Sequence, residues 1–128
     1  MAIVTGDQAT AADVKAIVRH FTEMVSSVQT VPNNAWTDWD LVAIVPANTK
    51  SVIVDIHRKA DYGDFDYTVG ARKNGSSDTR TFEVNNLHRT RIIIETECDS
   101  SRIIELYGST NADTRWQARI LGYWAEAT

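Results

Sequence analysis

Apolar residues recur at helical spacing in the first part of the chain. Thr10 can cap a first turn, with Asp13 three residues later in a variant of the capping box. The apolar positions that follow fall three or four residues apart and predict a helix over residues 10–28, which Pro32 ends. They form one stripe made of Val14, Ile17, Val18, Phe21, Val25 and Val28.

This stripe must cover a second apolar surface. It can pack on a sheet of its own subunit, or it can pack against copies of itself in an oligomer. Both alternatives stay open, so Val14, Ile17 and Phe21 are candidate contacts with a partner. Residues 1–9 are interpreted as a short lead-in arm.

After Pro32 the pattern changes to the two-residue period of β-strands. Val52, Val54 and Ile56 share one strand face, for example, and Asp55 lies on the other. Turn-forming sequences rich in Pro, Asn, Gly and Ser separate the apolar runs. The predicted strands cover residues 41–45, 51–58, 65–72, 79–84, 90–97, 101–107 and 115–124.

Several short strands with turn signals roughly every 8–12 residues predict an all-β domain. No helical pattern alternates with the strands, so a parallel α/β sheet is not expected. The expected fold is mainly β, an antiparallel, jelly-roll-like β-sandwich with one N-terminal α-helix. Its parts are an arm and helix over residues 1–33 and a sandwich domain over residues 34–128, which together form a single compact unit.

Length and charge exclude several classes of partner. With 128 residues the chain can form one domain with a sizeable core. Its net charge of −4 offers no positive surface to a nucleic-acid backbone, so no nucleic-acid partner is expected. The N-terminus lacks the pattern of a signal peptide, and no apolar run approaches the roughly 20 residues that span a bilayer. We therefore expect synthesis and folding in the cytoplasm and no membrane partner.

One loop gathers carboxylates and aromatic rings. Asp61, Asp64 and Asp66 surround Gly63 and could supply oxygen ligands for calcium. Their spacing is not that of an EF-hand, so we interpret the loop as a solvated acidic segment and expect no metal site. The interleaved aromatic residues form a candidate ligand loop made of Tyr62, Phe65 and Tyr67.

Nothing else in the sequence has the spacing of a catalytic site. The three histidines are scattered, and His57 with Asp55 is interpreted as a surface pair. Cys98 is the only cysteine, and the acidic residues Glu97 and Asp99 beside it are expected to raise its thiol pKa. No nucleophile elbow, zinc-binding helix or phosphate loop occurs. The chain is therefore expected not to be an enzyme, and neither catalytic residues nor cofactors are predicted.

The tryptophans suit packing or recognition. Trp116 lies on the apolar face of its predicted strand and is expected in the core. Trp36 and Trp39 precede the first predicted strand, where a subunit contact or a ligand platform would each make sense. We prefer packing, and both residues are candidate partner contacts.

Four segments follow the predicted helix in a recurrent order: WTDWDL (residues 36–41), VPANT (45–49), VGARKNGS (69–76) and LGYW (121–124). Their order and spacing resemble a β-sandwich module of tailed-phage virion proteins, found in head decoration proteins and in tail- or fibre-associated chains. The lead segment GDQATAADVKAIV (6–18) is similar to the helical entry segment of many phage fibre and decoration proteins. The resemblance covers almost the whole chain, although no single motif is diagnostic.

This resemblance implies a structural protein of a bacteriophage virion, made in the host cytoplasm, that decorates the capsid or acts as a small head- or tail-associated adaptor. It implies a homo-oligomer, commonly a trimer, that contacts other virion proteins, and it transfers no catalytic residue. A carbohydrate-binding module that holds a host surface glycan with exposed aromatic residues is the alternative. A small lyase or hydrolase on a jelly roll is the third interpretation, and the missing catalytic motifs make it the weakest.

Overall fold

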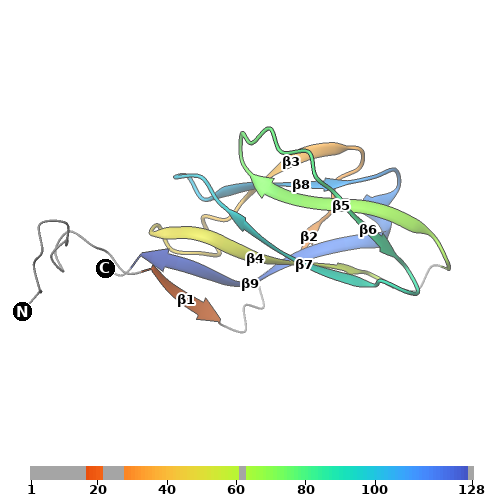
Figure 1. The fold of residues 1–128 in the computed structure, drawn as a ribbon, viewed down its shortest axis with the longest axis horizontal. Coiled ribbons are helices and arrows are strands. Elements are labelled where there is room, and N and C mark those ends of the chain that lie inside the picture. Colours follow the sequence, from red (N-terminus) through yellow and green to blue (C-terminus); the bar gives the residue numbers. More distant parts are fainter. Residues whose placement is uncertain (1–16, 22–27, 61–62, 127–128) are drawn as a thin grey trace, which may run out of the picture.

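Two antiparallel β-sheets face each other in the computed structural model, which describes residues 17–21, 28–60 and 63–126 (Figure 1). Within these residues one sheet holds five strands and the other holds four. A short helix, α1 (Ala112–Arg115), precedes the last strand. The strands are β1 (Ile17–Phe21), β2 (Gln29–Thr30), β3 (Ala35–Asp40), β4 (Thr49–Arg58), β5 (Asp66–Lys73), β6 (Phe82–Asn85), β7 (Arg91–Glu97), β8 (Ile103–Gly108) and β9 (Trp116–Glu126).

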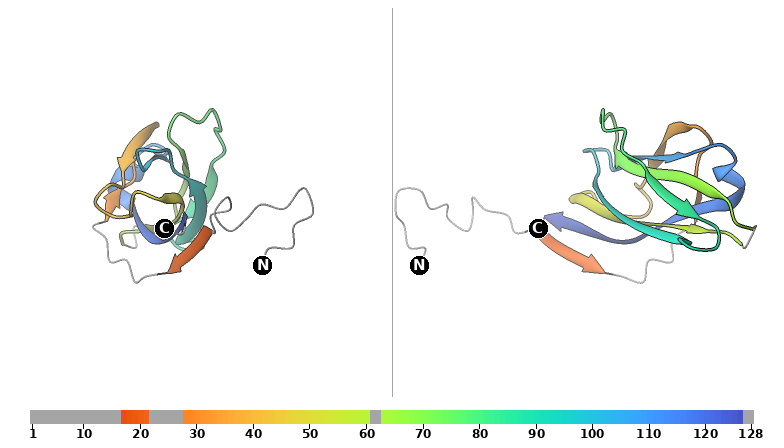
Figure 2. Two further views of the ribbon diagram at one scale, coloured as in Figure 1. Left: turned by 90° about the vertical axis from the view of Figure 1, so that its left-hand side faces the viewer. Right: turned by 45° about the vertical axis from the view of Figure 1, so that its right-hand side comes forward.

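The chain changes sheets at most of its connections. The five-stranded sheet has the order β1-β9-β4-β7, with β2 also paired to β9, and the four-stranded sheet has the order β3-β8-β5-β6. Only β5 and β6, among the strands from β3 onward, follow each other within one sheet, where they form a hairpin. Ile17 lies opposite Glu126, so β1 begins beside the end of β9, at one end of the molecule (Figures 1 and 2).

The core lies between the two sheets. Successive side chains of a strand face opposite sides, so every second residue of each central strand points into this space. Full burial of one large apolar side chain contributes about 1.5–3 kcal/mol. The predicted alternation on the central strands and the predicted core position of Trp116 are confirmed. Fully buried residues include Val52, Val54 and Ile56 of β4, Ile104 of β8, and Trp116, Ala118 and Ile120 of β9.

The predicted N-terminal helix is wrong where the structure describes this region. Residues 17–21 form β1, which pairs along its whole length with the end of β9. β-branched residues such as Ile17 and Val18 favour strands, and the edge of β9 supplies backbone partners that a helical pattern does not reveal. Val28, the last residue of the predicted stripe, is 47% exposed. The parts of the predicted helix outside the described residues are 10–16, with Val14, and 22–27.

The predicted strand over residues 41–45 is also wrong, because this segment is a turn. The N–H groups of Ile44 and Val45 donate to Leu41 O at 2.8 and 3.0 Å. Asp40 Oδ1 accepts from the Val42 N–H at 2.9 Å. Leu41, Ile44 and Val45 are spaced like one face of a helical turn and pack together against the core.

The strand missing from the sequence prediction lies directly before this turn. β3 has the sequence AWTDWD, which contains no alternating apolar run. Trp39 nevertheless lies opposite Ile104 and faces the core, whereas Trp36 lies opposite Tyr107 on the outer face. The other six predicted strands coincide with β4 to β9 to within a few residues.

Candidate functional site

A groove runs along the open edge where the two sheets approach each other. β7 is the outer strand of the five-stranded sheet, and β6 is the outer strand of the four-stranded sheet. Residues 94–97 of β7 line one side of the groove, and residues of β5, β6 and their connection line the other. Because four consecutive residues of β7 take part, the groove follows the edge of that strand. We call this hollow of about 440 Å³ the edge groove.

The edge groove is lined by a few apolar residues and by more numerous charged residues, which we call its rim. Ala71, Phe82 and Ile94 supply the apolar lining. Phe82 lies opposite the core residue Val69, so its ring is on the inner side of its sheet. It is still 41% exposed, because β6 is the last strand of that sheet among the described residues. The rim is formed by Arg72, Lys73, Asp78, Arg80, Glu95 and Glu97.

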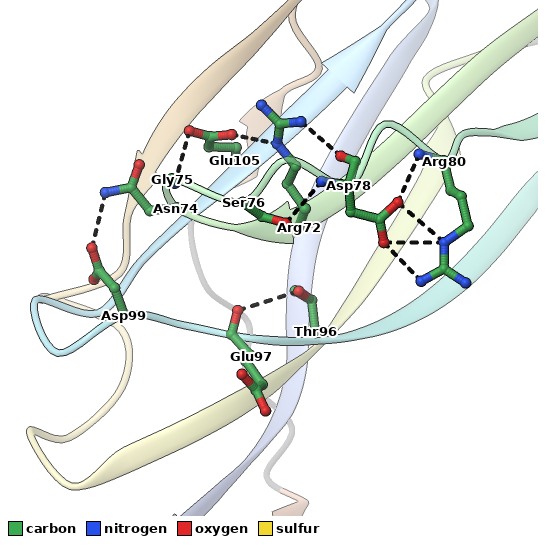
Figure 3. A network of polar contacts seen from close by, with 10 residues as sticks. All are labelled: Arg72, Asn74, Gly75, Ser76, Asp78, Arg80, Thr96, Glu97, Asp99 and Glu105. Atoms are coloured by element: carbon green, nitrogen blue, oxygen red, sulfur yellow. Dashed lines mark hydrogen bonds and ion pairs between the residues drawn. The ribbon is translucent and has the colours of Figure 1, made fainter.

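Arg72 fixes one wall of the edge groove, the connection between β5 and β6 (Figure 3). Its Nε donates to Glu105 Oε1 at 2.5 Å, and its Nη1 donates to Asp78 O at 2.6 Å. Glu105 Oε2 in turn accepts from the Gly75 N–H at 3.3 Å. Gly75 has a φ of 79°, which glycine adopts without steric cost. The Arg72 and Glu105 side chains are only 16% and 12% exposed, so this pair anchors the connection from inside.

Carboxylates hold the same connection at two further points (Figure 3). Arg80 Nε and Nη2 donate to Asp78 Oδ2 at 3.0 and 2.7 Å, and these hydrogen bonds lower the pKa of Asp78 to about 2. Asn74 Nδ2 donates to Asp99 Oδ2 at 2.9 Å. Partial desolvation raises the pKa of Asp99, but the hydrogen bonds from Asn74 and from two backbone N–H groups outweigh it, so this pKa lies below its ordinary value. Both carboxylates are ionised at neutral pH, so neither serves as a proton donor there.

Arg72 also covers Trp36 on the outer face of the four-stranded sheet. The guanidinium carbon lies 4.1 Å from the ring centroid of Trp36, a cation–π contact. The ring of Tyr107 is 5.3 Å away, tilted by 39°. A Cβ at Gly70 would lie 2.8 Å from Trp36 Cη2, so the indole ring rests against this glycine. The Trp36 ring is therefore half-buried and packs against Arg72, Tyr107 and Gly70 of its own chain.

A second hollow, of about 550 Å³, adjoins the edge groove and extends to Cys98. Lys73 and Glu97 are among the residues that line both hollows. Cys98 Sγ donates to Thr49 O at 3.5 Å. Burial raises the pKa of the Cys98 thiol, and Asp99 adds to this effect. The predicted direction is confirmed, although burial is the main cause and the acidic neighbours are not.

The predicted partner contacts are dispersed over the molecule. Ile17 and Phe21 lie in β1, at the opposite edge of the five-stranded sheet from β7. Trp39 is 6% exposed and packs in the core, which leaves little of its surface for a partner. Neither Trp36 nor Trp39 is among the described residues that line the edge groove.

The predicted ligand loop does not present its aromatic rings together. Tyr67 is buried, and its ring meets the ring of Trp116 edge-on with centroids 6.2 Å apart. Phe65 is 55% exposed. Tyr62 lies outside the described residues.

The acidic residues of the same loop hold an amide. Asp64 Oδ1 and Asp66 Oδ1 each accept from Asn85 Nδ2 at 2.7 Å. Asp61 belongs to the part of the chain that the structure does not describe. Across the described ranges, no group of three or more His, Cys, Asp or Glu side chains could hold a metal ion.

The pairing of His57 with Asp55 is confirmed, but its predicted surface position is wrong. The Asp55 side chain is only 1% exposed, and His57 Nδ1 lies 3.4 Å from its Oδ2. Arg91 and Arg119 also donate to this carboxylate, from positions 36 and 64 residues away in the sequence. A buried carboxylate needs such partners, and only the pairing of β4 with β7 and β9 brings them to it. Spacing along the sequence gave no signal for these two arginines.

In the part of the chain that the structure describes, no helix has the length and apolar character needed to cross a membrane. Comparison with known protein families, curated proteins and solved structures found no match to this chain. The likeness to phage virion modules therefore rests on the order and spacing of sequence segments alone.

Proposed function

We propose that this chain is a structural module of a tailed-phage virion, which decorates the capsid or joins its parts through contacts with copies of itself and with other virion proteins. The observation that carries the proposal is the edge groove, a hollow along the outer edge of β7 that combines the apolar residues Ala71, Phe82 and Ile94 with charged side chains of both signs. An extended segment of a neighbouring copy can add to the sheet at β7 and place an apolar side chain against Phe82. Such a contact joins copies of the chain non-covalently and needs no catalytic residue.

The strand order supports the proposal as well. The order β1-β9-β4-β7 facing β3-β8-β5-β6 supports a jelly-roll β-sandwich, which is the finer fold that we propose. Jelly rolls occur in viral capsid domains and also in lectins, so the fold by itself does not choose between assembly and glycan binding. The edge groove is the feature that favours assembly.

The rim of the edge groove suits a protein partner. Arg72 is paired with Glu105, and Arg80 is paired with Asp78, so each charge is held at a set position. Both signs of charge occur along the rim, which lets complementary side chains of a partner fix the register of a bound segment. We infer that the rim supplies specificity and that the apolar lining supplies most of the affinity.

A carbohydrate-binding module is the second candidate, and the exposed ring of Phe65 is the observation that favours it. Stacking on a sugar requires an open aromatic face. Trp36 already stacks with Arg72 and Tyr107, and Trp39 lies in the core. Phe65 would therefore have to stack on the sugar without a contribution from Trp36 or Trp39.

The role of the edge groove can be tested by replacing Phe82 with Asp and measuring the mass of the protein by light scattering after gel filtration. We expect the wild-type chain to form a discrete homo-oligomer, a trimer in the simplest case, and Phe82→Asp to lower its mass to that of the monomer. Leu87→Asp is the matched control, because Leu87 is 42% exposed, close to the 41% of Phe82, and does not line the groove. Its mass should equal that of the wild type.

Circular dichroism must show that both variants keep their β structure. Thr96→Arg is a second variant in the groove, for use if Phe82→Asp does not fold. An oligomer that survives both changes in the groove would contradict the proposed contact. A monomeric wild-type protein that binds oligosaccharides on a glycan array would favour the carbohydrate-binding alternative.

A further inference from the structure

Two arginines and a histidine surround a buried carboxylate on the outer face of the five-stranded sheet. Arg91 Nε of β7 donates to Asp55 Oδ1 at 2.7 Å, and Arg119 Nε of β9 donates to Asp55 Oδ2 at 2.9 Å. In the register of the sheet, Asp55 lies opposite Arg119 and His57 lies opposite Arg91. Residues that are directly opposite share a face, so the four side chains form one cluster.

Asp55 uses only one nitrogen of each guanidinium group. Within the described ranges, the Nη atoms of Arg91 and Arg119 have no hydrogen-bond acceptor. The two side chains are 48% and 41% exposed, so their remaining N–H donors are accessible to solvent. The buried carboxylate therefore holds two guanidinium groups close together and leaves their outer edges unused.

The cluster carries a net positive charge, because two guanidinium groups oppose one carboxylate. His57 Nε2 accepts from Gln117 Nε2 at 2.9 Å, which leaves the proton of the neutral ring on Nδ1, the atom that faces Asp55. Burial lowers the pKa of His57; Asp55 opposes this effect, and Arg119 and Arg91 add to it. The neutral form of His57 is therefore favoured, and a proton gained at lower pH or beside a further negative charge must go to Nε2, where it displaces the hydrogen bond from Gln117.

We propose that Arg91, Arg119 and His57 form a binding site for a doubly charged oxyanion, a phosphate or sulfate group. The planar donors of guanidinium groups match the oxygens of such a group. Ile93, 54% exposed, lies opposite Asp55 on the same face and can contact an apolar part of the molecule that carries the oxyanion. None of these three residues lines the edge groove, and the proposal does not depend on the proposed function.

Titration of the intact chain with sulfate, followed by NMR at constant ionic strength, tests the site. The charge of sulfate does not change between about pH 8 and about pH 6, so any pH dependence belongs to the protein. We expect saturable shifts of the Arg91 and Arg119 side-chain N–H signals and of the His57 ring, with tighter binding at the lower pH. Chloride should give no saturable shift. Phenyl phosphate should bind more tightly than inorganic phosphate if the oxyanion belongs to a larger ligand, and equally tightly if the free ion is the ligand.

Two substitutions separate this site from a general charge effect, and a third tests the role of the histidine. Arg91→Gln leaves Asp55 paired with Arg119 and should weaken sulfate binding roughly tenfold, the effect expected of one lost charge-assisted hydrogen bond. Lys59→Gln removes the same charge just beyond β4, outside the cluster, and should leave binding unchanged. His57→Gln should abolish the pH dependence. The site is overturned if sulfate causes no saturable shift in the wild type, or if Arg91→Gln and Lys59→Gln weaken binding equally. Unchanged pH dependence in His57→Gln would overturn the role given to the histidine.

Discussion

Gly108 lies at the end of β8, where the chain passes closely over its own earlier part. A Cβ at this position would overlap Pro32 O and would lie 2.5 Å from Val31 Cγ1 and 2.6 Å from Ala112 Cβ. We expect Gly108→Ala to lower the free energy of unfolding by about 3 kcal/mol, because backbone and packed side chains must shift. Gly75→Ala is the control, since Gly75 has open space around it and the change costs only about 1 kcal/mol of conformational strain at its positive φ. Urea denaturation measures both, and equal losses would contradict a steric role for Gly108.

Asp78 is the residue whose ionisation reports most directly on the wall of the edge groove. Its pKa of about 2 depends on hydrogen bonds from Arg80, so Arg80→Ala should raise this pKa toward the ordinary value of 3.8. The pKa in the folded state lies below that of the unfolded state. The pair therefore favours the folded state above about pH 4, and this contribution is lost as the pH falls toward about 2.

A carboxyl-carbon NMR titration of Asp78 measures the effect. Lys73→Ala removes a different positive charge of the edge groove without removing a hydrogen bond to Asp78, and it should leave the pKa near its wild-type value. If Arg80→Ala does not change the pKa, the side-chain hydrogen bonds of Arg80 drawn in Figure 3 are not its cause.

Among the elements, β1 is the one for which sequence pattern and structure differ most, because the pattern is helical and the structure is a strand. Arg19 lies opposite Trp124 in antiparallel register with β9. We expect nuclear Overhauser contacts between the backbone protons of these two residues and slow exchange of the amides that pair the strands. Contacts between residues three positions apart within 17–21, with none to β9, would mean that the strand is not formed in solution.

The sequence predicts elements well where one face of a strand is buried and the other is exposed. Strand β9 alternates in this way from Trp116 onward, and the prediction for it is confirmed. The pattern fails for β3, where only Trp39 faces the core, and for residues 41–45, where an apolar run forms a turn. In both segments too few apolar positions exist to distinguish a period of two from a period of three or four.

The edge groove could not be predicted from the sequence, because its walls come from residues 71–82 and 94–97 and meet only through the strand order. The sequence shows the charged residues on both sides of Phe82, but such residues are as typical of a solvated loop as of a binding groove. The pair of Arg72 with Glu105 joins residues 33 positions apart, and no local pattern connects them. Topology, rather than local sequence, creates this site.

At the scale of the whole molecule, one edge strand takes part in both proposed sites. Arg91, at the start of β7, contributes to the oxyanion cluster on the outer face, and residues 94–97, at its end, line the edge groove. An extended partner segment paired with β7 would therefore lie close to the cluster. The two sites can still be separated by experiment, because Phe82 belongs only to the groove and Arg119 only to the cluster.

The mass of the wild-type chain in solution tests the central claim, an assembly role through surface contacts, most directly. Light scattering coupled to gel filtration over a range of concentrations gives this mass without any variant. The account predicts one discrete species at a multiple of the 14.3 kDa of a single chain, three times that value for the trimer. A constant mass of 14.3 kDa at every concentration would contradict it.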